Sequence, residues 1–215
     1  FRDALRRGNE FVITCELVPP RGYDGKGIDR LLEFASRVAA SDRIHAVSVT
    51  DNAGGNPAFS ADGLCIEIQK MGADPLVHFS CKDMNRNGLE SRAYMLQRNG
   101  VTNLLVLTGD YPIAGYLGIS KPVFDVDSIT ALHHLRQMNK GLEVRTGKKT
   151  TTTTPTEFFL GAAASPFKWT EASSVMQYYK LEKKISDLNG EKAAAIPAII
   201  HALSIDNDRI RLELA

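Results

Sequence analysis

At 215 residues, with 43% hydrophobic and 24% charged side chains, the chain has the composition of an ordinary globular domain that can bury a full core. Its formal net charge of +1 gives no basis for attraction to nucleic acid or to an anionic membrane, so we expect neither partner. No apolar run is long enough to span a bilayer, and the sequence shows no signal-peptide pattern.

The three cysteines, Cys15, Cys65 and Cys81, are too few and too dispersed for a disulfide scaffold. None has a second Cys or a His at metal-site spacing, so we expect no metal site. The cytoplasm is the expected compartment. Because the sequence opens at Phe1 rather than at methionine, we expect the natural N-terminus to lie upstream.

The first half of the chain alternates predicted strands with predicted helices. A short basic helix over Arg2–Arg7 leads into strands that we predict from β-branched and apolar runs at Phe11–Leu17, Ile44–Thr50, Pro75–Cys81 and Asn103–Leu107. Apolar residues at helical spacing predict the intervening helices at Ile28–Ala40, Ser60–Met71 and Leu89–Asn99. Gly100 stands where a helix C-cap is common.

The second half continues the alternation less regularly. Asp125 or Asp127 can cap a helix that runs to about Asn139. The polar stretch 141–156, with its run of threonines, predicts a mobile loop. A fifth strand is predicted over Glu157–Ala163, and a further helix over Thr170–Leu188.

Five strand–helix alternations indicate a parallel α/β sheet, either open or closed into a barrel. No GxGxxG follows the first strand, which weakens a dinucleotide-binding open sheet. Functional-looking residues instead end several strands, as in (β/α)₈ TIM barrels. Such barrels need about 250 residues, but here about five β/α units use the chain to about Gly190. We therefore expect residues 1–190 to be one portion of such a barrel, with a sequence that is truncated or discontinuous after about residue 190, and residues 191–215 to be a tail of uncertain origin.

The strand over Asn103–Leu107 ends abruptly in Thr108-Gly109-Asp110. A buried parallel strand places such residues at the edge of the sheet where α/β folds bind ligands. Gly109 lets the backbone turn sharply or approach a ligand closely. Asp110 is either a strand-end turn residue or a carboxylate that faces a bound ring.

The other candidate residues are also individually unspecific. Glu16 has apolar neighbours and is expected to be partly desolvated, which raises the pKa of a carboxyl and suits it to general-acid work; a buried ion pair is equally compatible. His78 lies between Val77 and Phe79, where a satisfied core histidine is commoner than a ligand. The glycine-rich turn 51–57 resembles a phosphate cradle only weakly, and Lys184 has the pattern of a solvated helix charge.

In combination these residues resemble the methylenetetrahydrofolate reductase family. The matching motifs are CELVPPRG at Glu16, VSVTDN at Thr50, VHFSC at His78, LTGDYP at Asp110, FFLGAAASPF, and LEKKI at Lys184. The resemblance covers about Phe1 to Leu188. It implies a cytoplasmic flavoprotein and oxidoreductase of one-carbon, folate and methionine metabolism, built on a TIM barrel. The implied reaction passes a hydride from NAD(P)H, or another donor, through a flavin to 5,10-methylenetetrahydrofolate, giving 5-methyltetrahydrofolate.

The resemblance also implies roles for individual residues. Glu16 matches the general acid that helps to open the imidazolidine ring of the folate, and Asp110 matches an aspartate beside the flavin and the pterin. The remaining flavin-binding positions would be Thr50, Asp51, His78, Thr108 and Gly109, together with Ala164, Lys168, Gln177 and Lys184 toward the ribityl and phosphate groups. The implied cofactor is FAD, with FMN as the alternative, and no metal is implied. A homo-oligomer, or a subunit of a complex with a redox partner protein, is expected.

The sequence departs from the family pattern at several positions. Thr108 stands where some relatives carry arginine, Asp51 where some carry tyrosine, and Ala164 where some carry an aromatic residue. After Gly190 the next expected strand, with its folate-contacting glutamine, and a later folate-binding arginine have no counterpart. We therefore expect the parent protein to be the reductase, while this chain alone is expected to be inactive.

Three other interpretations stay open at the level of sequence. The chain could be a non-catalytic flavin- or pterin-binding subunit of a larger redox or methyl-transfer complex. It could be a pterin-dependent methyltransferase barrel, which would use no flavin. It could also be a fragment that does not fold, because an open five-stranded piece exposes a strand edge and apolar surface.

Overall fold

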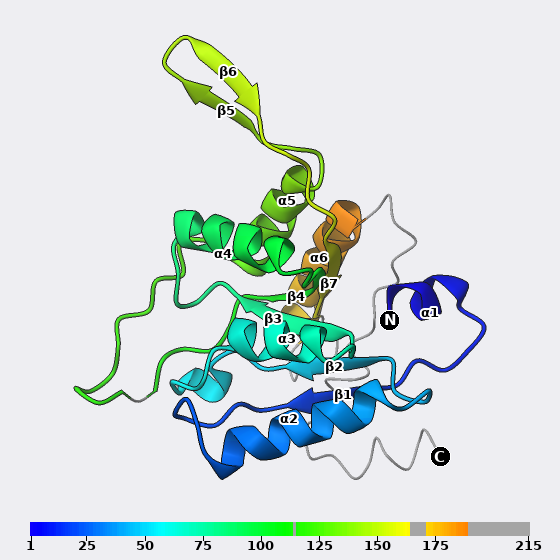
Figure 1. The fold of residues 1–215 in the computed structure, drawn as a ribbon. Coiled ribbons are helices and arrows are strands. Elements are labelled where there is room, and N and C mark those ends of the chain that lie inside the picture. The colour runs from blue at the N-terminus through cyan, green and yellow to red at the C-terminus, as the bar shows by residue number, and fades with distance from the viewer. Residues whose placement is uncertain (114, 164–170, 189–215) are drawn as a thin grey trace.

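The chain folds around one parallel sheet, in a computed structural model that describes residues 1–113, 115–163 and 171–188 (Figure 1). The sheet has the strand order β1-β2-β3-β4-β7, and each neighbouring pair is parallel. Its strands are β1 (Thr14–Leu17), β2 (Ala46–Val49), β3 (Pro75–Ser80), β4 (Asn103–Leu107) and β7 (Phe159–Ala162). The predicted mixed α/β class with a five-stranded parallel sheet is confirmed.

Helices connect successive strands of the sheet, as parallel pairing requires. They are α2 (Lys26–Ala39), α3 (Ala61–Lys70), α4 (Arg86–Arg98) and α5 (Ser128–Met138); α1 (Arg2–Arg7) precedes the sheet and α6 (Glu171–Leu188) follows it. A short 3₁₀ turn, η1 (Ala53–Gly55), follows β2. All the predicted helices are therefore present, with ends that differ by a few residues. Asp127 rather than Asp125 caps α5, because its Oδ1 accepts the Thr130 N–H at 2.9 Å.

The hydrophobic core lies between the sheet and helices α2–α5. Side chains of a strand alternate between its two faces, and the face toward the helices carries Val47, Val49, Val77, Phe79, Leu104 and Val106. The opposite face carries the other set of alternating residues, among them Glu16, Ser48 and His78. The sheet therefore separates a dry core from a second face with polar groups.

The segment 141–156 was expected to be a mobile loop, and this prediction is wrong. It forms an antiparallel hairpin of β5 (Glu143–Thr146) and β6 (Lys149–Thr152), which projects from the body of the molecule (Figure 1). Threonine is a good strand former because its β-branched side chain suits extended backbone. Gly147, with φ of 63°, supplies the left-handed residue of the two-residue turn. Low sequence complexity concealed both signals.

Within the described residues the sheet is open, with β1 at one edge and β7 at the other. The strands and helices follow in the order expected for the first five units of a (β/α)₈ barrel, but the closure of a barrel is not seen. Residues 191–215 lie outside the described residues.

Candidate functional site

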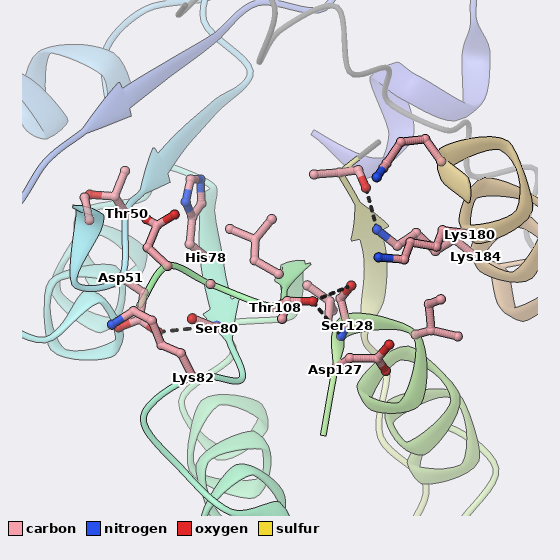
Figure 2. Close-up of a pocket in the computed structure, with 18 of the residues that line it drawn as sticks. Thr50, Asp51, His78, Ser80, Lys82, Thr108, Asp127, Ser128, Lys180 and Lys184 are labelled. Carbon is pink, nitrogen blue, oxygen red and sulfur yellow. Dashed lines mark hydrogen bonds between the residues drawn. The ribbon is translucent and has the colours of Figure 1, made fainter. Parts of the chain in front are cut away.

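A cavity of about 390 Å³ opens at the carboxyl ends of the parallel strands (Figure 2). Every predicted site residue that the structure describes lines this cavity. Those residues are Glu16, Thr50, Asp51, His78, Thr108, Gly109, Asp110, Gln177 and Lys184. Ala164 and Lys168, the other two predicted positions, lie outside the described residues. Residues far apart in the sequence thus meet because parallel strands present their carboxyl ends at one edge of the sheet.

Glu16, Ser48 and His78 form a polar cluster on the face of the sheet opposite the helices. Glu16 and Ser48 are register partners on β1 and β2. His78 is buried on β3, with its Nε2 at 2.8 Å from Ser48 Oγ and 3.7 Å from Glu16 Oε2. His78 is therefore a buried histidine with a hydrogen-bond partner, and it also lines the cavity. Both interpretations of this residue from the sequence agree with the structure.

The expected desolvation of Glu16 is not found in the described part of the chain. Its side chain is 45% exposed. The physical reason is that β1 is an edge strand in the described sheet, so no further strand flanks Glu16 on its open side. Apolar sequence neighbours alone do not bury a side chain, because they point to the other face of the strand.

The loop after β4 is fixed by contacts with two other segments. Thr108 Oγ1 accepts the Ser128 N–H and donates to Ser128 Oγ, both at 3.1 Å, which joins the loop to the start of α5. Asp110 Oδ2 accepts the Gly54 N–H at 3.1 Å, which joins the loop to the turn after β2. Asp110 is exposed and faces the cavity from this fixed position.

Glycine is required at Gly109 by both conformation and space. Its φ is +92°, and an added Cβ would lie 2.3 Å from Ser80 Oγ and 2.7 Å from Lys82 Cδ. The glycine-rich turn after β2 meets the same loop, since the Ile113 N–H donates to the Gly55 carbonyl at 3.1 Å. In this structure the turn after β2 holds the Asp110 loop, as expected if residues 51–57 are a tight turn rather than a phosphate-binding loop.

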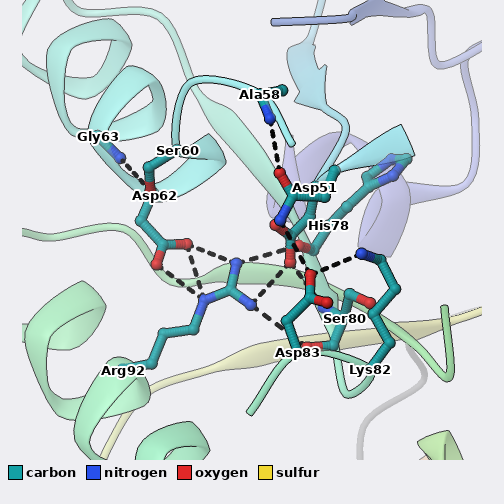
Figure 3. A network of polar contacts seen from close by, with 11 residues as sticks. Asp51, Ala58, Ser60, Asp62, Gly63, His78, Ser80, Lys82, Asp83 and Arg92 are labelled. Carbon is teal, nitrogen blue, oxygen red and sulfur yellow. Dashed lines mark hydrogen bonds and ion pairs between the residues drawn. The ribbon is translucent and has the colours of Figure 1, made fainter. Parts of the chain in front are cut away.

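Asp51 is held by a buried arginine of α4 (Figure 3). Arg92 Nη1 lies 2.9 Å from Asp51 Oδ2, and its Nε and Nη2 contact the Asp62 carboxylate at 2.6–2.9 Å. Burial alone would lower the pKa of Arg92, but the two carboxylates outweigh it and raise the pKa. The guanidinium also lies 4.7 Å from the centroid of the Phe79 ring. Asp51 therefore lines the cavity while one of its oxygens is already engaged.

Sequence reasoning missed Arg92, although the sequence carries a signal for it. Arg92 falls at a core position of α4, three residues after Leu89 and four before Leu96, and all three are buried. A charged residue at such a position needs a buried partner of opposite charge. The two acids, Asp51 and Asp62, come from segments too far away in sequence for a local pattern to identify them.

Lys82 is a second buried cation beside the cavity, and it was also missed. Its residue exposure is 2%, and its Nζ donates to Asp83 Oδ2 at 2.6 Å. Asn52 Nδ2 donates to the same oxygen at 2.9 Å. Partial burial opposes ionisation of Asp83, but these two hydrogen bonds and the Lys82 charge outweigh it and lower its pKa.

Helix α6 contributes two lysines to the opposite side of the cavity (Figure 2). Lys184 Nζ donates to the Ala163 carbonyl at 2.6 Å. Its burial, and next the nearby charge of Lys180, lower the pKa of Lys184, while Asp127 acts in the other direction. Lys184 is thus half-buried at a site rather than a solvated helix charge, and it lies where a bound anion would relieve the repulsion between the two ammonium groups.

A comparison with known protein families shows the family to which the chain belongs. The family model for methylenetetrahydrofolate reductase matches residues 1–146, which is more than half of the chain. The chain belongs to the methylenetetrahydrofolate reductase family. The match includes Glu16, Thr50, His78 and Asp110 and ends before β7 and α6. A search of curated proteins found no match.

Membership of the methylenetetrahydrofolate reductase family supports a folate-related reductase activity. Among the described residues, there is no group of three or more His, Cys, Asp or Glu side chains that could hold a metal ion. None of the helices in the described ranges combines the length and apolar character needed to cross a bilayer.

Proposed function

We propose that the protein reduces 5,10-methylenetetrahydrofolate to 5-methyltetrahydrofolate with a bound flavin, using electrons from NAD(P)H or another donor. The observation that carries this proposal is that Glu16, His78 and Asp110 line the same cavity as the lysines of α6. Membership of the methylenetetrahydrofolate reductase family supports the same conclusion.

We also propose that the described sheet is the first five units of a (β/α)₈ barrel and that residues 1–190 form its flavin-binding portion. The strand order and the helices that connect the strands support this. In a barrel the face that carries Glu16, Ser48 and His78 would be the interior. Strands beyond β7 would then cover the open side of Glu16 and supply further contacts to the folate.

The lining of the cavity supports the flavin that the family implies. Its volume of about 390 Å³ is in the range of small-molecule sites, about 300–1,000 Å³. Lys180 and Lys184 provide positive charge for phosphate oxygens, and Gln177 on the same helix provides a polar contact. Thr50 and Thr108 line the other side of the cavity and would contact the ring system. FAD is the proposed cofactor, with FMN as the alternative, and the flavin when bound supplies hydride transfer through its N5.

The residues of the chain supply the acid–base and electrostatic parts of the reaction. Glu16 donates a proton to the folate nitrogen that leaves the methylene carbon, so that the five-membered ring opens to an iminium cation. The Asp110 carboxylate, fixed by the Gly54 N–H, stabilises this cation until hydride adds to the methylene carbon. The substrate thereby gains one proton and one hydride, and the donor loses two electrons.

The visible absorbance spectrum of the purified chain, before and after dithionite, tests the flavin site. A band that bleaches on reduction, and a released cofactor that chromatography identifies as FAD, would support the proposal. Folate turnover is measured next in the intact parent protein, with Glu16→Gln as the variant expected to keep the flavin and lose turnover. A folded but colourless chain that also fails to take up added FAD or FMN would contradict the flavin site. Flavin without turnover would favour the non-catalytic subunit.

A further inference from the structure

The geometry around His78 points to a function for Ser48, a residue with no assigned role. Two oxygens approach the same ring atom, His78 Nε2: Ser48 Oγ at 2.8 Å and Glu16 Oε2 at 3.7 Å. A ring nitrogen either carries a hydrogen or offers a lone pair, so it cannot donate to one oxygen while it accepts from the other. Ser48 and Glu16 therefore compete for one position.

The distances indicate which state the ring adopts. If Nε2 carried a hydrogen, the carboxylate would be the stronger acceptor, and a charge-assisted bond would be about 2.7–2.9 Å long. The carboxylate oxygen instead lies beyond hydrogen-bond distance, and the neutral hydroxyl occupies the bonded position. Burial of His78, which is 6% exposed, also disfavours a charged ring. The heavy-atom contact allows either direction, and these two features favour the one in which the serine hydroxyl donates to an unprotonated Nε2.

We propose that Ser48 is a positioning residue that holds His78 Nε2 as a hydrogen-bond acceptor and so prevents the ring from pairing with the Glu16 carboxylate. Register places Ser48 directly beside Glu16 on neighbouring strands, so the hydroxyl is fixed by the sheet rather than by a loop. The consequence for catalysis rests on the proposed function: an imidazole N–H bonded to Glu16 would favour its ionised form, and a general acid must carry its proton.

Other charged groups surround this cluster and have their own contacts. Arg92, from α4, donates to the His78 carbonyl at 3.3 Å and to Asp51. Asp110 accepts from Gly54, and Lys82 donates to Asp83. Across the cavity lie Asp127 of the α5 cap and the α6 lysines Lys180 and Lys184. None of these hydrogen bonds involves Ser48, so a Ser48 substitution is expected to leave them unchanged. A change in His78 titration would then report on the contact between His78 and Glu16.

The test is an NMR titration of the His78 ring in the full chain, with its signal assigned from the spectrum of His78→Gln. In Ser48→Ala, Nε2 loses its donor and can take up a hydrogen that it donates to Glu16, and an anionic neighbour favours the charged ring. We expect the His78 midpoint to rise by about one pH unit, as for an opposite charge at this range. In the Glu16→Gln background the same substitution is expected to produce little shift.

Matched variants keep the test decisive. Ser48→Thr retains the hydroxyl and is expected to keep the midpoint of the unsubstituted chain. Ser80→Ala removes a buried β3 hydroxyl that has no hydrogen-bond partner among the described residues, and it is expected not to move the midpoint. If circular dichroism shows that Ser48→Ala does not fold, Ser48→Cys keeps the size with a weak donor and should shift the midpoint in the same direction. An unmoved midpoint, or an equal shift with Gln at position 16, would overturn the proposal.

The pH dependence of folate reduction gives a second readout. Ser48→Ala is expected to move the alkaline fall of the rate to lower pH, because Glu16 then loses its proton earlier, whereas Ser48→Thr is not. An intact parent protein without folate reduction would refute the proposed function, whereas the 215-residue chain alone is expected to be inactive. The NMR titration would still decide whether Ser48 separates His78 from Glu16.

Discussion

Replacement of Gly109 by alanine tests the tight packing behind the Asp110 loop. An alanine Cβ would meet Ser80 Oγ at 2.3 Å and Lys82 Cδ at 2.7 Å, and both side chains are buried. The positive φ costs an L-residue about 1–2 kcal/mol, and overpacking adds about 1–3 kcal/mol. Gly72 is the matched control, because its φ is +90° and no atom of the described ranges lies within 4 Å of an added Cβ.

Urea unfolding followed by circular dichroism separates the two contributions. Gly72→Ala should show the conformational cost alone, and Gly109→Ala should lose about 1–3 kcal/mol more. With an m-value of about 2 kcal/mol per molar urea, this difference lowers the midpoint by a further ~0.5–1.5 M. Adding Ser80→Ala to Gly109→Ala should restore part of the loss. Equal midpoints for the two glycine variants would refute the packing argument.

Three other substitutions test further parts of the structure. Arg92→Met leaves the buried Asp62 and the partly buried Asp51 without their partner and should lower the free energy of unfolding by about 3–5 kcal/mol in urea. A loss below about 1 kcal/mol would contradict the ion-pair network. Lys184→Met should weaken flavin binding by about tenfold or more in a fluorescence titration, as expected for a charge-assisted hydrogen bond. The exposed neighbour Lys183→Met should not, and equal effects would argue against the phosphate site. Arg86 lowers the pKa of Asp125 to about 2 through its side-chain and backbone hydrogen bonds. The pair therefore stabilises the fold at pH values above the unfolded carboxyl pKa of about 4, and this stabilisation is lost as the pH falls through about 2. The stability difference between parent and Arg86→Met should therefore be present at about pH 5 and disappear near pH 2, and a difference independent of pH would exclude this carboxylate as its source.

The order of strands and helices was predictable because it depends on local patterns. Alternation of apolar strands and amphipathic helices indicated the parallel sheet, and residues at strand ends indicated Glu16, Thr50, His78 and Asp110 as neighbours. Residues at these positions lie close together independently of side-chain packing, because the carboxyl ends of parallel strands lie at one edge of the sheet. The β5–β6 hairpin was missed because polar composition outweighed the strand propensity of its threonines.

Contacts between distant side chains could not be read from local sequence. The exposure of Glu16 depends on β1 being an edge strand, which is a property of the whole sheet. Lys82 and Lys180 were missed because they reach the cavity from segments distant in sequence from its other residues. Arg92 and Ser48 were missed because their partners lie on other elements.

The Arg92 network has an evolutionary consequence. Its guanidinium joins the end of β2 through Asp51, the first turn of α3 through Asp62 and the backbone of β3 through the His78 and Ser80 carbonyls. Loss of the arginine alone would leave two negative charges without their cation, whereas loss of one acid would leave a balanced one-to-one ion pair. The arginine should therefore be retained wherever either acid is present. Relatives that carry another residue in place of Asp51 are expected to keep the arginine together with the acid at position 62.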